Sequence, residues 1–201
     1  MDIQKRSNLT IGLTILVGLL FLSPIVKVVQ PVGFLFNVVF AGLVGFFLLK
    51  KPFVEQFKHF KFKVLLYGIP LTFLVGILSG ILYQSIAGKP TTNNIDAAIS
   101  IAMLVTQVPF MLMGEEMLST NLLLALENKG VSFRLASTIV AVLFAFWHIS
   151  AYGFHPLQLL MTLFPIRLVL NFLWKRSNSI WVSWICHLLY DLLSLVPMAL
   201  R

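Results

Sequence analysis

Charged residues are scarce in this chain. Of its 201 residues only 11% are charged and 59% are hydrophobic, and the mean hydropathy is +0.94. Soluble domains are usually about 45–50% apolar and about 25% charged. Because so few polar residues cannot cover the surface of a globule of this size, a soluble enzyme and a disordered chain are excluded. The composition predicts an integral membrane protein.

Cysteine is almost absent as well. The single Cys186 excludes an internal disulfide and a zinc cluster built from cysteines, and we expect it to be a buried, inert thiol. No small-residue cleavage site follows the first apolar run, so we interpret that run as an uncleaved first span. No stretch alternates polar and apolar residues with the period of two that a strand requires.

Most of the sequence consists of long apolar runs. A helix needs about 20 apolar residues to cross a membrane. The runs predict an all-α, polytopic helical bundle with about seven transmembrane helices in a single membrane domain, 1–201. Within it, 1–90 holds helices without motifs and 97–198 holds the helices that carry the candidate site. The seven predicted spans are 9–29, 31–49, 63–87, 97–126, 132–152, 155–173 and 178–198.

The net charge of +8 reflects topology in this interpretation. The basic residues lie between apolar runs, so we expect no nucleic-acid partner and a lipid bilayer as the environment. Eleven of them fall at the N-terminus and in the loops after spans two, four and six, against three on the opposite side. This asymmetry predicts a multi-pass protein of the plasma membrane with a cytoplasmic N-terminus. The aromatic and basic stretch 51–63 predicts a short amphipathic segment on the inner membrane surface.

Five ionisable residues within the predicted spans form a candidate site. Measured along the helices at 1.5 Å per residue, they lie about 16–22 Å from the basic flanks, so three helices bring them to a similar depth. Ionisable groups inside a membrane are costly and point to function. Two neighbouring carboxylates in a low dielectric suit general acid or base chemistry. The five are Glu115, Glu116, His148, His187 and Asp191.

Two alternatives remain open at this point. The polar groups can serve as hydrogen bonds between helices, with no chemistry of their own. They can also line an ion or proton pathway, as in a small transporter.

The order and spacing of these residues resemble the CPBP family (CAAX proteases and bacteriocin-processing enzymes, also called Abi), a family of intramembrane proteases. That family carries the motifs EExxxR, FxxxH and HxxxN or HxxxD on successive helices. The resemblance covers about residues 100–195, and the first 90 residues share only their hydrophobicity. The matching positions are Glu115, Glu116 and Thr120 in the first motif, Phe144 and His148 in the second, and His187 and Asp191 in the third.

The resemblance implies hydrolysis of a peptide bond in a membrane-associated peptide. Glu115 would be the general base, with His148 helping to orient the water. His187 and Asp191 would stabilise the oxyanion, and Glu116 would support the cluster from behind. The family has been described both as metalloproteases and as glutamate proteases, so the metal is left open. If zinc is bound, Glu115, His148 and His187 are its expected ligands. The resemblance also implies a role in peptide maturation or in self-immunity to a bacteriocin.

One position departs from the family pattern. The arginine of the first motif falls on Thr120, so Glu116 is left without its expected partner. Three interpretations follow: a non-catalytic immunity or scaffold protein, a hydrogen bond from Thr120, or a charge supplied by Arg167 from another helix. For Arg167 itself we favour snorkelling to the inner surface over pairing with Glu116. A non-catalytic membrane protein of the same fold and a small transporter are therefore the alternatives to a protease.

Overall fold

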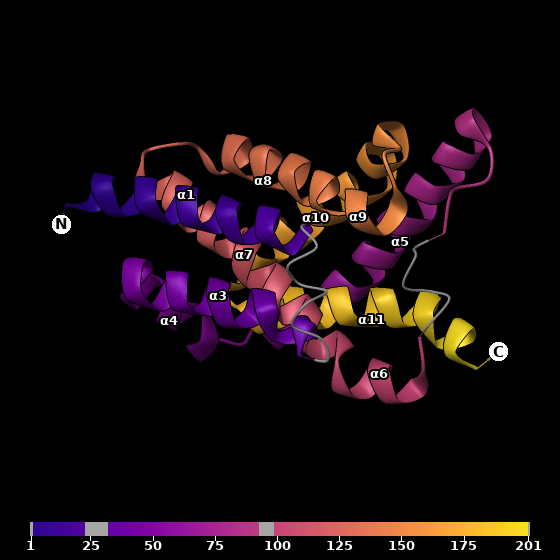
Figure 1. Cartoon of the computed structure of the whole chain (residues 1–201), viewed down its shortest axis with the longest axis horizontal. Helices are drawn as coiled ribbons and strands as arrows, with labels where there is room; N and C mark the ends of the chain where they lie inside the picture. The colour runs from indigo at the N-terminus through magenta and orange to yellow at the C-terminus, as the bar shows by residue number, and fades with distance from the viewer. Residues whose placement is uncertain (1, 23–31, 93–98, 201) are drawn as a thin grey trace.

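The computed structural model describes residues 2–22, 32–92 and 99–200, and these residues form helices and no strand. The long helices run roughly along one axis, with the two termini at opposite ends (Figure 1). The predicted all-α class is confirmed. The helices are α1 (Ile3–Leu22), η1 (Gly33–Leu35), α3 (Phe36–Val44), η2 (Gly45–Leu49), α4 (Lys51–Lys58), α5 (Phe62–Ala87), α6 (Ile101–Thr106), α7 (Val108–Asn128), α8 (Phe133–Trp147), α9 (Ile149–Tyr152), α10 (Pro156–Ser177) and α11 (Ile180–Ala199).

The number of spans differs from the expected seven. Among the described residues, five helices are long and apolar enough to cross a membrane: α1, α5, α8 continued by α9, α10, and α11. A sixth results if Gly33–Leu49 and Lys51–Lys58, which are bent by 118°, count as one broken span. The remaining predicted span, 97–126, is not such a helix. Residues 23–29 of the first predicted span, residue 31 of the second and residues 97–98 of this one lie outside the described residues.

The segment 97–126 divides into α6 and α7 for a local reason. Pro109 stands in the first turn of α7, where its missing N–H costs nothing, and Gln107 caps the end of α6. Because α7 carries two glutamates and an asparagine at its centre, it is too polar for a lipid-facing span. It packs instead inside the bundle, in contact with α1, α3, α8 and α11.

A glycine brings α3 directly against α7. A Cβ atom on Gly114 would lie 2.7 Å from the backbone nitrogen of Val38, so only glycine fits there without a shift. Further along α7, the Asn121 side-chain amide donates a hydrogen bond of 2.8 Å to the backbone oxygen of Ala41. Gly114 immediately before the two glutamates and Asn121 after them therefore fix the placement of α7 against α3.

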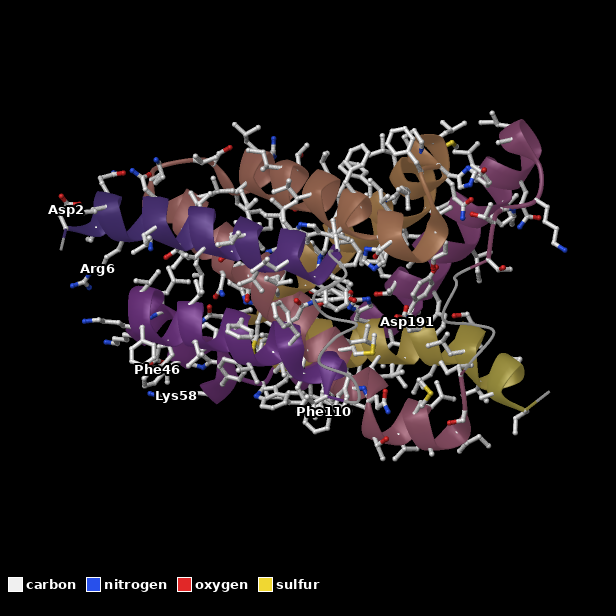
Figure 2. All side chains as sticks on the ribbon, viewed as in Figure 1. Asp2, Arg6, Phe46, Lys58, Phe110 and Asp191 are labelled. Carbon is white, nitrogen blue, oxygen red and sulfur yellow. The ribbon has the colours of Figure 1, made fainter. Side chains whose placement is uncertain are left out.

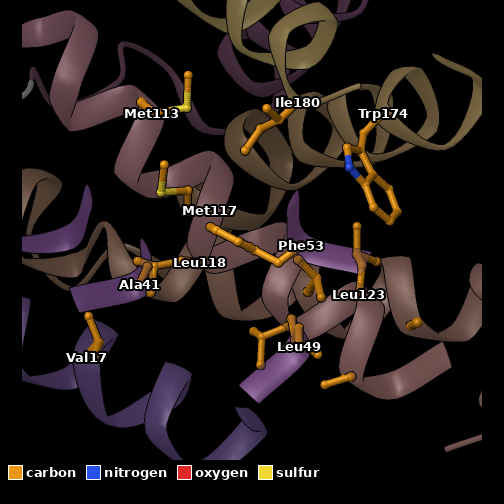
Figure 3. Packing of buried hydrophobic residues seen from close by; sticks show 14 of the residues in the cluster. Val17, Ala41, Leu49, Phe53, Met113, Met117, Leu118, Leu123, Trp174 and Ile180 are labelled. Carbon is orange, nitrogen blue, oxygen red and sulfur yellow. The ribbon is translucent and has the colours of Figure 1, made fainter. Parts of the chain in front are cut away.

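Of three apolar clusters among the described residues, the two larger lie beside the polar centre. The larger one joins buried side chains of α1, α3, α4, α7 and α8, as Figure 3 shows for Val17, Ala41 and Leu118. The second joins α5, α10 and α11, and it includes Cys186, which is fully buried as expected for an inert thiol.

One end of the bundle collects most of the basic side chains, and we call it the basic end. Lys129 of α7 contacts Asn8 of α1, and Lys175 of α10 pairs with Glu127 of α7 at 2.5 Å. Arg6 and Lys58 lie at this end in Figure 2, well away from Asp191. The predicted amphipathic segment forms α4 here. It is held by Trp174, whose indole Nε1 donates to Gln56 Oε1 at 3.0 Å.

Candidate active site

The centre of the site is a buried ion pair between α7 and α10. The guanidinium of Arg167 donates to both carboxylate oxygens of Glu116, at 2.7 Å and 3.0 Å, and both side chains are 0% exposed. Two parallel bonds of this kind fix both direction and distance. Removing one partner of such a pair leaves an uncompensated buried charge, which costs about 3–5 kcal/mol.

Arg167 is itself held by further contacts. Its Nε donates to the Asn171 side-chain oxygen at 2.9 Å, and the Asn171 amide donates to the Ser137 hydroxyl at 3.0 Å. The guanidinium carbon lies 5.2 Å from the centre of the Phe144 ring, a cation–π arrangement. Helix α8 therefore contributes to placing the arginine that faces Glu116.

This geometry corrects the favoured expectation for Arg167. The side chain does not snorkel to the surface, because Glu116 and Asn171 bind all three of its nitrogen atoms in the interior. Thr120 does not bond to Glu116 either: its hydroxyl donates to the backbone oxygen of Met117 at 3.4 Å. Of the three interpretations of the Thr120 departure, the structure matches the one in which Arg167 supplies the charge.

His187 links the ion pair to the other carboxylates. Its Nδ1 donates to Glu116 Oε1 at 3.0 Å, which fixes the ring orientation. Its Nε2 then lies 3.9 Å from Glu115 Oε2 and 3.8 Å from Asp191 Oδ2. Three carboxylates therefore surround one imidazole.

His148 approaches the same carboxylate from α8. It lies where α8 ends and α9 begins, and its Nδ1 donates to the backbone oxygen of Phe144 at 2.8 Å. Its Nε2 faces Glu115 Oε2 at 3.7 Å. The Phe144 ring lies against both imidazoles, with ring centres 4.6 Å from His148 and 5.9 Å from His187.

Glu115 is the least constrained member of the cluster. Its Oε2 is buried, forms no hydrogen bond with any described residue and has two imidazole Nε2 atoms within 3.9 Å. The Glu115 side chain is 16% exposed, those of His148 and Asp191 are 19% and 30% exposed, and that of Glu116 is 0% exposed. The site thus has a closed anchor around Glu116 and a more accessible edge around Glu115.

The structure brings together all five residues that the sequence singled out, and Phe144 with them. It adds Asn171 and Ser137, which sequence reasoning did not name. A signal for Asn171 existed, since it follows Arg167 by one helical turn and shares its face. Ser137 gave no such signal, because its role depends on how α8 packs against α10.

The fit to a metal ion is poor in this arrangement. Within the described part of the chain, no group of three histidine, cysteine or carboxylate side chains is placed to hold a metal. The Nδ1 atoms of both histidines are bonded within the protein, and their Nε2 atoms lie 3.7 Å and 3.9 Å from Glu115 Oε2.

Fold and site together define a polytopic α-helical membrane protein with a buried glutamate–histidine centre. Residues 96–193 match the family model described as type II CAAX prenyl endopeptidase Rce1-like. The match confirms the resemblance of this region to the CPBP family of CAAX-type proteases, and the region contains the positions of all three motifs. Comparisons with curated proteins and with solved structures found no match.

Proposed function

We propose that this protein is an intramembrane endopeptidase that hydrolyses a peptide bond of a membrane-associated peptide. The observation that carries the proposal is the placement of Glu115 Oε2. It has no hydrogen bond of its own and lies between the Nε2 atoms of His148 and His187. The family match supports a hydrolase of the CAAX protease type.

The spacing at Glu115 suits the activation of water. Polar atoms 3.7–3.9 Å apart are too distant for a direct hydrogen bond but can share a bridging water. In the proposed reaction Glu115 removes a proton from a water that His148 orients, and the water oxygen bonds to the carbonyl carbon. The carbon–nitrogen bond then breaks, and Glu115 returns the proton to the leaving amine nitrogen.

The second histidine serves the oxyanion in this mechanism. Because His187 gives its Nδ1 hydrogen to Glu116, it donates to a developing oxyanion from Nε2 as the imidazolium. Asp191, 3.8 Å from that nitrogen, supports the charged ring and orients it. Phe144 covers both rings and limits the access of bulk water.

Glu116 and Arg167 act as positioning residues in the proposal. They hold His187 in place and do not meet the reacting atoms. Arg167 takes the part that the first-motif arginine of the family would play from the position of Thr120. A non-catalytic protein was favoured by a Glu116 without a partner, but Arg167 binds both oxygens of Glu116. A small transporter has no specific contact in its favour.

The family match and the charge distribution support a proposal for the biological setting. We propose a multi-pass protein of the plasma membrane with the basic end, and so the N-terminus, in the cytoplasm. Peptide maturation or self-immunity to a bacteriocin is the proposed role, with a membrane peptide as the partner.

A cleavage assay tests the proposal. Purified wild-type protein in detergent is incubated with a library of membrane peptides, beside Glu115→Gln and His148→Ala, each with and without a chelator. Glu127→Gln is the matched control, because Glu127 lies on the same helix but pairs with Lys175 at the basic end. We expect cleavage by the wild type and the control only, unchanged by the chelator. Equal cleavage by Glu115→Gln would overturn the proposal.

A further inference from the structure

A second feature of the molecule lies outside the active site, at the basic end. A groove of about 690 Å³ opens where α5 begins and α10 ends. One wall is formed by Lys61 and the first six residues of α5, and the other by the last two turns of α10. The lining residues are Lys61, Phe62, Lys63, Val64, Tyr67, Phe172 and Arg176.

The groove is strongly positive. Three of its seven lining residues are cations and none is a carboxylate. Neighbouring cations are neutralised: Lys58 pairs with Glu55 at 3.0 Å, and Lys175 pairs with Glu127. Within the described ranges, no carboxylate pairs with Lys61, Lys63 or Arg176.

Two of these cations are held in place. Lys61 Nζ donates to the backbone oxygen of Arg176 at 3.2 Å, which ties the start of α5 to the end of α10. The Arg176 guanidinium lies 5.4 Å from the centre of the Phe172 ring. The charge is therefore part of a formed site, with less conformational freedom than a pair of free surface lysines.

The groove changes from charged to aromatic along the helix axis. Tyr67 lies one turn after Lys63, and Phe172 lies one turn before Arg176, so these two aromatic side chains are deeper along the membrane-crossing helices than the cations. The third aromatic residue, Phe62, lies between Lys61 and Lys63. Tyr67 is 43% exposed and Phe172 is 36% exposed, so part of each ring can contact an apolar chain. A ligand that fits must carry a negative head and an apolar body, side by side at the membrane surface.

We propose that this groove binds the phosphate headgroup of an anionic phospholipid, with the upper part of an acyl chain against Tyr67 and Phe172. Basic pockets between membrane helices bind such headgroups, and amphipathic aromatic rings favour the depth just below them. The lipid would join α5 to α10, the helix that carries Arg167. Binding is independent of the proposed peptidase activity and can be measured without it.

Native mass spectrometry of the detergent-purified protein tests the proposal. The protein is titrated with phosphatidylglycerol, with zwitterionic phosphatidylcholine as the comparison lipid. The test variant is Lys63→Gln/Arg176→Gln. The matched control is Lys5→Gln/Arg6→Gln, which removes one lysine and one arginine from the same end but outside the groove.

We expect the groove variant to bind phosphatidylglycerol about 10- to 30-fold more weakly than the wild type, as two lost charge contacts predict. The control should bind it within about twofold of the wild type. An equal loss in both variants would overturn the proposal in favour of general surface charge. Displacement of the lipid by excess inorganic phosphate would overturn it in favour of a free-phosphate site. The single variant Lys63→Gln provides a milder change if the double variant is poorly folded, and it should show a smaller loss in the same direction.

Discussion

Glu115 and Glu116 are neighbours in the sequence but have opposite surroundings. Glu116 has both oxygens bound by Arg167 and one of them also by His187. Glu115 has an oxygen without a hydrogen bond and lies at the accessible edge of the site. Adjacent residues on a helix point about 100° apart, so one can face the anchor while the other faces the reacting groups. The proposed division of roles follows from this difference.

This difference predicts that stability and activity separate between the two glutamates. Glu116→Gln breaks a fully buried ion pair, so we expect a loss of about 3–5 kcal/mol and a clearly lower Tm in detergent. Glu115→Gln removes no hydrogen bond from Oε2, so the Tm should stay within a few degrees of the wild-type value. Cleavage should fall about 10²- to 10⁴-fold, because the general base is lost. Thermal unfolding and cleavage rates, measured on the same preparations of each variant, check the predictions for stability and for activity. Equal losses of Tm would contradict the division of roles.

The identity of the site residues could be read from the sequence, but the pairing could not. Glutamates, histidines and an aspartate at similar depths predicted a cluster because their helix positions alone set the depth. The Arg167–Glu116 pair joins residues 51 positions apart, and it depends on how α7 and α10 are rotated toward each other. No pattern within one helix encodes that rotation, so snorkelling was favoured and was wrong.

At the scale of elements, α7 is held close to α3 by Gly114. A methyl group there would meet the backbone of Val38, which cannot move aside as the end of a flexible side chain could. The same contact lies directly before Glu115, so a displaced α7 would also shift the reactive carboxylate. Packing and catalysis are therefore coupled at this position.

Gly114→Ala should consequently lower both stability and activity. Overpacking of this kind costs about 1–3 kcal/mol, and we expect a lower Tm together with slower cleavage. Gly12→Ala is the matched control, because a Cβ on Gly12 meets nothing within 4 Å and alanine favours helix. Its Tm should be unchanged or slightly higher. If both alanine variants unfold at the wild-type temperature, the close approach of α3 and α7 does not matter for stability.

The elements themselves were largely predictable. Long apolar runs mark α5, α10 and α11 because lipid-facing helices need them, and the aromatic and basic pattern of 51–63 marked α4. The expected span 97–126 is not a single helix: its hydrophobicity was averaged across Gln107, where α6 gives way to α7. A helix buried among other helices tolerates polar residues that a lipid-facing span does not, and this reduced the number of lipid-facing candidates.

At the scale of the whole molecule, charge separates the two ends of the bundle. The basic end joins the starts of α1 and α5 to the ends of α7 and α10. Helix α5, with 26 residues, is about 39 Å long and carries the chain to the other end, where Lys89 follows it. The proposed topology places these two ends on opposite sides of the membrane.

Labelling of introduced cysteines tests this topology. Cys186 is fully buried, so the unmodified protein should react little with a membrane-impermeant maleimide. We expect Lys89→Cys to be labelled in intact cells and Lys51→Cys only after lysis, because basic loops remain in the cytoplasm. The reverse pattern would place the N-terminus outside.

The proposed active site depends on one relocated charge. We propose that Arg167 on α10 takes the place of the arginine that the family motif has at position 120; it binds Glu116, which binds His187 beside Glu115. If this is correct, the arginine should be able to return to its motif position, one turn from Glu116 on α7.

The most direct measurement is the rate of peptide cleavage by four proteins: the wild type, Arg167→Leu, Thr120→Arg and the double variant Arg167→Leu/Thr120→Arg. We predict that Arg167→Leu loses at least about 100-fold, because a buried carboxylate is left unpaired. The double variant should recover a substantial part of that loss, whereas Thr120→Arg alone adds a second buried cation and should not exceed the wild type. Full activity in Arg167→Leu, or no recovery in a double variant that is folded, would contradict the account.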